Sequence, residues 1–125
     1  MTLFRLLPVV AVAAALSLPS AAAAHAHLVR STPAAGSTAA SPRVISLTFS
    51  ERMAPAFSTF EVVNAAGVKT PVRTTVSEDG KTLSAPVARP LAAGAYVINW
   101  RLASSDGHRM TGAVPFTVRR AWRPG

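Results

Sequence analysis

The sequence has 125 residues, no cysteine, three histidines and a formal charge of +8, which comes from 13 basic and 5 acidic side chains. This length suits one small domain and excludes two. The lack of cysteine excludes a disulfide framework, a thiolate zinc site, an iron–sulfur cluster and a cysteine nucleophile. Any metal must therefore be bound through nitrogen, oxygen or thioether ligands.

Residues 1–24 have the pattern of a secretory signal peptide. A basic start precedes an apolar run over 6–18, which is shorter than the about 20 residues needed to span a bilayer. The alanines before position 25 allow cleavage before His25, and a cut before His27 fits the same small-residue rule. We expect export to the periplasm, with a cleavage site that decides which histidine carries the free α-amine.

The region that follows shows the period-2 alternation of β-strands. Over 44–49, for example, Ile45, Leu47 and Phe49 share one face. Turn signals at 64–67 and 78–80 separate neighbouring strands. About seven short strands predict an all-β, Ig-like Greek-key sandwich. The predicted strands cover 28–31, 44–49, 57–63, 68–76, 81–87, 95–103 and 113–118.

The basic residues are scattered from Arg30 to Arg123 and do not alternate with aromatic residues as in a nucleic-acid platform. We therefore expect no nucleic-acid partner. A local basic cluster occurs at 119–123, within a short tail over 119–125 that we expect to be exposed. The positive charge favours a soluble monomer with weak attraction to an anionic cell envelope.

Few residues can supply metal chemistry. Asp106 and His108 are two positions apart, and in an extended segment such residues point to the same side. The alternative is an ordinary Asp-Gly turn with an exposed histidine. If His25 is the first residue, its α-amine, with an unperturbed pKa of about 7.7–8, and its imidazole can chelate one ion. Three nitrogens and one oxygen suit Cu(II), and zinc is not excluded.

Several short motifs follow the predicted cleavage site in a specific order. They are His25-Ala26-His27-Leu28-Val29, Ser31-Thr32-Pro33-Ala34, Leu47-Thr48-Phe49-Ser50-Glu51, Trp100-Arg101, Ser105-Asp106-Gly107-His108 and Thr111-Gly112. In order and spacing they resemble the CopC family of periplasmic copper-binding proteins. The resemblance implies a CopC-like, cupredoxin-like domain over 25–118 that binds one Cu(II) through His25, Asp106 and His108. It also implies that Glu51 lies close by and orients the α-amine.

The resemblance further implies a role in copper resistance, without enzymatic activity. Copper is then stored or passed to a CopD-like inner-membrane permease. Family members that bind Cu(I) use a methionine-rich loop with an added histidine, but residues 63–72 here contain neither residue type. We therefore predict no Cu(I) site of that kind. We expect Met53 and Met110 to pack in the core, and the alternative is a weak thioether ligand near the copper. A second departure is His27, which can compete for Cu(II) with the help of backbone amides.

Two other functions stay open at this point. One is a copper redox enzyme with an N-terminal histidine brace, although four protein ligands leave no easy equatorial position for oxygen. The other is an exported β-sandwich module whose histidines are incidental. A hydrolase that uses Ser104 or Ser105 with Asp106 and His108 is dismissed, because these residues lie along one segment, whereas a catalytic triad converges from separate elements.

Overall fold

The computed structural model describes residues 26–121. The predicted signal peptide over 1–24 and the predicted ligand His25 lie outside the described residues. Within 26–121, no helix is long and apolar enough to cross a lipid bilayer.

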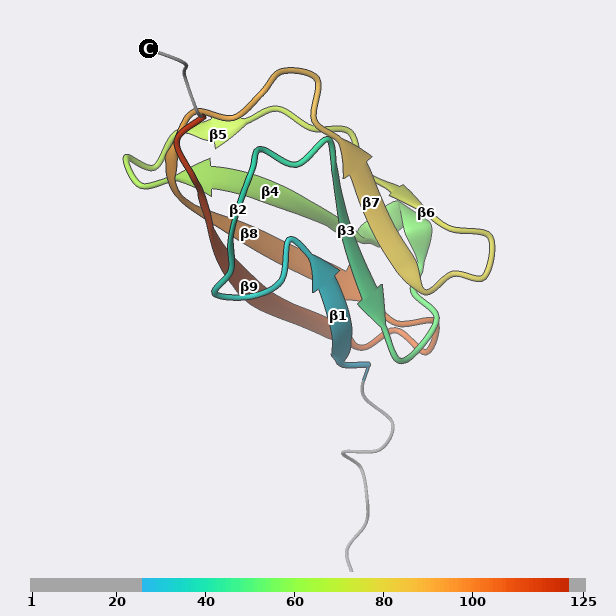
Figure 1. The fold of residues 1–125 in the computed structure, drawn as a ribbon. Coiled ribbons are helices and arrows are strands. Elements are labelled where there is room, and N and C mark those ends of the chain that lie inside the picture. Colours follow the sequence, from blue (N-terminus) through green and yellow to red (C-terminus); the bar gives the residue numbers. More distant parts are fainter. Residues whose placement is uncertain (1–25, 122–125) are drawn as a thin grey trace, which may run out of the picture.

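Two β-sheets lie face to face (Figure 1). All neighbouring strands are antiparallel except β2 and β9, which are parallel. This arrangement confirms the predicted all-β sandwich. In spatial order, the first sheet contains β1 (Leu28–Thr32), β3 (Val44–Phe49), β7 (Thr82–Pro86) and β6 (Thr75–Val76). The second contains β2 (Thr38–Ala39), β9 (Arg109–Val118), β8 (Gly94–Ala103), β4 (Thr59–Asn64) and β5 (Lys69–Thr70).

The core lies between the two sheets and is filled by the alternating apolar residues of the strands. In β3, Ile45, Leu47 and Phe49 are each at most 1% exposed, as the period-2 pattern predicted. Across the core, Phe49 meets Trp100 of β8 edge-on, with ring centres 4.9 Å apart. Full burial of one such side chain contributes about 1.5–3 kcal/mol, so the alternating apolar residues stabilise the packing of the two sheets.

The described part of the chain contains nine strands, compared with about seven predicted. The predicted strand over 68–76 is divided into β5 and β6, which belong to different sheets. Pro71 lies between them and has no N–H group for a continuous ladder. The strand predicted to start at Phe57 starts at Thr59 instead, after a 3₁₀ turn, η3 (Pro55–Phe57). The two-residue strand β2 was not predicted, because its parallel pairing with β9 leaves no local pattern.

One end of the sandwich collects the residues with metal-binding chemistry. The strands β1, β7 and β9 begin there, and β3 and β8 end there, in the lower part of the view in Figure 1. A bridge between Met53 and Ser104 joins the two sheets at this end. We call it the histidine end, because His27 and His108 both lie there.

Candidate metal centre

A tight turn connects β8 to β9 and carries two of the predicted ligands. The N–H of Ser104 donates to the carbonyl of His108 at 2.8 Å, and the N–H of Gly107 donates to the carbonyl of Ser104 at 2.9 Å. Gly107 has a φ of +94°, a conformation that glycine adopts without the steric cost that a Cβ adds. The turn therefore depends on the glycine between Asp106 and His108.

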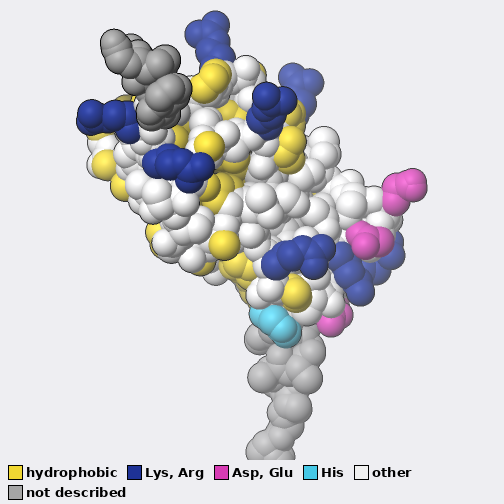
Figure 2. Space-filling model, in the orientation of Figure 1, with side chains coloured by type: hydrophobic (Ala, Val, Ile, Leu, Met, Phe, Trp, Pro, Cys, Tyr) yellow, Lys and Arg dark blue, Asp and Glu magenta, His cyan; other side chains and the backbone are white. Residues whose placement is uncertain are grey.

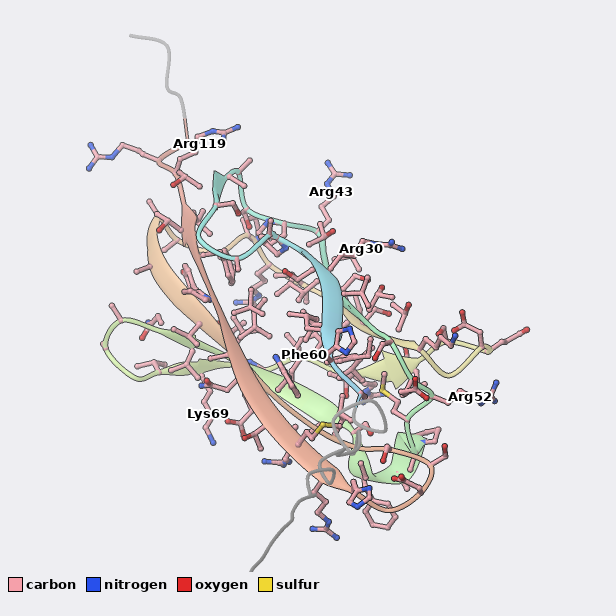
Figure 3. The ribbon with its side chains drawn as sticks, turned by 90° about the horizontal axis from the view of Figure 1, so that it is seen from below. Arg30, Arg43, Arg52, Phe60, Lys69 and Arg119 are labelled. Atoms are coloured by element: carbon pink, nitrogen blue, oxygen red, sulfur yellow. The ribbon has the colours of Figure 1, made fainter. Side chains whose placement is uncertain are left out.

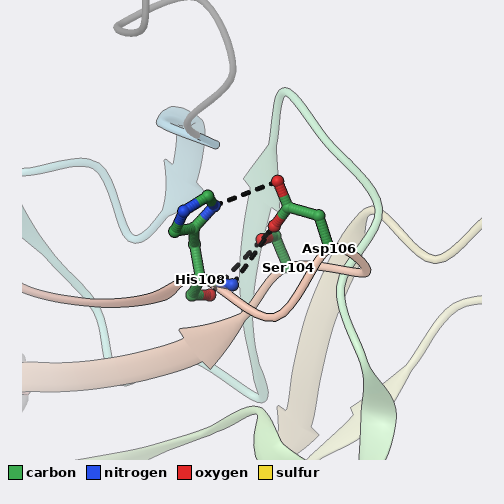
Figure 4. A network of polar contacts seen from close by, with 3 residues as sticks. All are labelled: Ser104, Asp106 and His108. Carbon is green, nitrogen blue, oxygen red and sulfur yellow. Dashed lines mark hydrogen bonds and ion pairs between the residues drawn. The ribbon is translucent and has the colours of Figure 1, made fainter.

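The carboxylate of Asp106 organises this turn (Figure 4). Its Oδ1 accepts hydrogen bonds from the hydroxyl of Ser104 and, at 3.1 Å, from the N–H of His108. Its Oδ2 lies 3.0 Å from Nδ1 of His108. The hydrogen bond from the Ser104 hydroxyl, followed by those from His108, lowers the pKa of Asp106 to about 2. Asp106 is therefore ionised at every pH at which the protein is expected to work.

The ionised carboxylate determines which imidazole nitrogen can bind a metal. A carboxylate has no proton to donate, so Nδ1 of His108 is the donor in their contact. In the neutral imidazole the lone pair is then on Nε2. The side chains of His108 and Asp106 are 59% and 50% exposed, so both are open to an ion from solution.

The prediction that Asp106 and His108 meet agrees with their 3.0 Å contact, but the reason given for it was wrong. The segment is not extended, because Gly107 reverses the chain direction. The alternative Asp-Gly turn is also present. The turn and the paired side chains are therefore one structure.

The first described residues are fixed at the same end of the sandwich. Ala26 is 5% exposed and belongs to the core. The N–H of His27 donates to Oγ of Ser50 at 2.9 Å, and the N–H of Ser50 donates to the carbonyl of His27 at 2.9 Å. The Nδ1 atom of His27 also lies 3.2 Å from Oγ of Ser50. The chain around His27 is therefore held along the segment that follows β3.

That segment, residues 50–54, links the N-terminal residues to the turn. The N–H of Ala54 donates to the carbonyl of Ala103 at 2.7 Å, and the N–H of Ser105 donates to the carbonyl of Arg52 at 3.3 Å. Glu51 is exposed within this segment, next to Ser50. Three stretches that are far apart in the sequence therefore lie together, which the sequence alone could not show.

The described residues hold part of the predicted ligand set. Asp106 and His108 are in contact, while His27 and Glu51 lie at the same end. Within residues 26–121, no three His, Cys, Asp or Glu side chains come together as a group that could hold a metal ion. The remaining predicted ligand, His25, lies outside the described residues.

Both methionines pack as predicted. Met53 is 4% exposed in the core, and Met110 packs against the core. Sequence reasoning missed Ser50 and Ser104, the two serines that position the histidine end. Ser104 was considered only as a nucleophile, and its position two residues before Asp106 was the signal for a hydroxyl-to-carboxylate hydrogen bond.

Fold and site together define a small two-sheet β-sandwich with an exposed carboxylate–imidazole pair at one end. Residues 28–119 match the CopC domain family, and the chain belongs to this family. The resemblance drawn from the sequence motifs is thereby confirmed.

Relatives of known name support the assignment. The chain is 42% identical over 114 residues to copper resistance protein C of Pseudomonas syringae pv. tomato. This alignment covers 86% of this chain and 90% of that protein. It is 34% identical over 124 residues to copper resistance protein C of Xanthomonas campestris pv. juglandis, with 93% and 98% of the two chains covered.

Solved structures share the fold. CopC from Methylosinus trichosporium OB3b superposes with a TM-score of 0.74 at 30% identity, over 81% of this chain and all of that one. PcoC, a methionine-rich copper resistance protein from Escherichia coli, gives a TM-score of 0.70 at 34% identity, over 77% of this chain and all of that one.

Proposed function

We propose that this protein is a periplasmic copper-resistance protein that binds one Cu(II) ion at the histidine end. Its relatives are named copper resistance proteins. The observation that carries the proposal is the ionised Asp106 held against His108 at the end of the sandwich where the N-terminal residues are fixed. This pair supplies one oxygen and one nitrogen, which are ligand types that Cu(II) accepts.

The other two nitrogens come from His25 in this proposal. Its Cα is bonded through one peptide to the buried Ala26, and consecutive Cα atoms are about 3.8 Å apart. After cleavage before His25, its α-amine and its imidazole form a chelate, because an α-amine has a pKa of only about 7.7–8 and loses its proton readily. The set of His25, Asp106 and His108 then has the mixed nitrogen and oxygen character that favours Cu(II).

Glu51 has a supporting role in the proposal. It is exposed in the segment that contacts both His27 and the turn of Asp106. A carboxylate there can accept a hydrogen bond from a copper-bound amine and orient it.

The competing mode through His27 is less favoured by the structure. A local chelate of the first three residues uses the backbone nitrogen and the imidazole of the third. Both groups of His27 already contact Oγ of Ser50, at 2.9 and 3.2 Å. This mode therefore has to break two contacts, whereas Asp106 and His108 are already in place.

We assign binding rather than catalysis to this site, because four protein ligands fill the equatorial positions that Cu(II) prefers. A chain with a secretory signal peptide acquires its copper outside the cytoplasm. The stored ion is then available for transfer to a CopD-like inner-membrane permease.

The absence of catalysis can be tested by oxygen uptake in the presence of a reductant. Oxygen uptake by the copper-loaded protein should not exceed that of the metal-free protein.

The experiment compares two chains that differ by one residue. The first chain starts at His25, as checked by mass spectrometry. The second chain has one additional alanine before His25. Cu(II) titration, followed by tryptophan fluorescence, should show one tight site in the first chain. The additional residue should weaken binding by more than the roughly 10–100-fold that loss of an outer partner costs, because it removes the α-amine from His25. Equal binding by both chains would show that the amine is not a ligand.

A further inference from the structure

The end of the sandwich opposite the histidine end is strongly basic. β3 and β8 begin there, and β7 and β9 end there. The N–H of Val87 donates to the carbonyl of Arg43, and the N–H of Arg119 donates to the carbonyl of Ala39, which fixes both arginines at this end. We call it the arginine end, defined by four exposed side chains: Arg43, Arg89, Arg119 and Arg120.

The acidic residues lie elsewhere. Of the five in the sequence, Glu61 lies within β4 and pairs with Lys69 at 3.2 Å. The other four lie at the histidine end: Glu51, Glu78, Asp79 and Asp106. On the face shown in Figure 2, dark blue side chains mixed with yellow apolar surface occupy the upper end, and the lower right holds both magenta and dark blue side chains. The histidine end therefore carries charges of both signs, because Arg52, Lys81 and Arg109 accompany its acidic residues. Among the described residues, the charged side chains of the arginine end are all basic.

The arginine end also has a preformed apolar hollow. A cavity of about 670 Å³ opens there, lined mostly by alanines, Pro90, Leu91 and Val118, and also by Ser41, Arg119 and Arg120. The connection that forms one wall is fixed, because the N–H of Leu91 donates to Oγ of Ser41 at 2.8 Å and the hydroxyl of Tyr96 donates to the carbonyl of Ala92 at 2.7 Å.

Two exposed apolar side chains lie at the same end of the sandwich. Val44, at the start of β3, is 49% exposed, and Val68, in the turn between β4 and β5, is 59% exposed. Figure 3 shows the side chains of Arg43 and Arg119 pointing outward from the sandwich. The sequence continues after residue 121 with Trp122 and Arg123, an aromatic and a cation, which are residue types that favour a membrane interface.

We propose that the arginine end docks on the surface of a bilayer that contains anionic phospholipids. Guanidinium groups bind lipid phosphates through paired hydrogen bonds, and each basic residue near such a surface adds to the attraction. The apolar hollow beside Arg119 and Arg120 contacts the region beneath the headgroups. Docking in this orientation directs the histidine end away from the lipid and into the aqueous phase. The proposal does not depend on copper binding, so either can fail without the other.

The test is sedimentation with vesicles in about 0.1 M salt, at which charges more than about 10 Å apart are largely screened. The chain from His25 to Gly125 should bind vesicles of phosphatidylglycerol mixed with phosphatidylcholine, and not vesicles of phosphatidylcholine alone. The variant R119A/R120A should bind about 25-fold more weakly. Millimolar inorganic phosphate should not release the protein. A free phosphate ion can replace the lipid phosphates at the arginines, but it cannot replace the apolar contact with the bilayer.

The matched control is R30A/K81A, which removes the same charge from exposed positions away from the arginine end. It should bind the anionic vesicles nearly as well as the parent chain. Equal losses in the two double variants would show attraction to net charge alone and overturn the proposal. It would also be overturned if the parent chain stayed in solution with anionic vesicles, or if phosphate released it.

Discussion

At the scale of single residues, the carboxylate of Asp106 links the turn to the candidate site. It accepts hydrogen bonds from Ser104 and His108 and thereby fixes both the backbone and the imidazole. The residue types at this site could be predicted from the sequence, because Asp-x-His next to a predicted strand is visible there. The contribution of Ser104 and Ser50 could not be predicted from the sequence, because it depends on how residues 50–54 pack against the turn.

The pKa of Asp106 gives a test at this scale. The pKa of this carboxyl group in the metal-free protein should be about 2 by NMR titration, and Ser104→Ala should raise it toward 3.8, because the largest cause of the shift is removed. The lowered pKa means that ionised Asp106 stabilises the fold above pH 3.8, and that this contribution is lost as the pH falls through about 2. A value near 3.8 in the parent protein would contradict the network.

At the scale of elements, the alternation of apolar residues was enough to predict β3, β8 and the part of β9 over 113–118, although β9 begins at Arg109. The alternation did not predict strands whose existence or bounds depend on the strand with which they pair. The predicted strand over 68–76 became β5 and β6 of different sheets, and β2 exists only through its parallel pairing with β9. Such pairings are tertiary contacts between segments far apart in the chain, so the alternation of apolar residues within one segment cannot predict them.

The pairing of β8 with β9 gives a test at this scale. Gly112 lies opposite Trp100, and a Cβ at position 112 would overlap ring atoms that are already packed against Phe49. Gly112→Ala should therefore lower the free energy of unfolding by about 1–3 kcal/mol in urea denaturation. In a Trp100→Leu background the loss should be much smaller. Equal losses in the two backgrounds would show that the strand, and not the ring, rejects the added methyl group.

At the scale of the whole molecule, the fold separates two kinds of surface. The histidine end carries the carboxylate–imidazole pair and most of the acidic residues, while the arginine end carries exposed guanidinium groups and an apolar hollow. A net charge from the sequence cannot show this division, because it depends on which turns of the two sheets share an end. The sandwich thus gives this small protein two opposed surfaces with different chemistry.

In the proposed copper centre, the N-terminal histidine and the turn between β8 and β9 form one Cu(II) site. The most direct measurement is the electron paramagnetic resonance spectrum of the Cu(II)-loaded chain that starts at His25. The variant D106A/H108A should give a clearly changed spectrum, and the control His27→Ala should give the parent spectrum. An unchanged spectrum in D106A/H108A, together with a changed one in His27→Ala, would contradict this account and assign the copper to the first three residues.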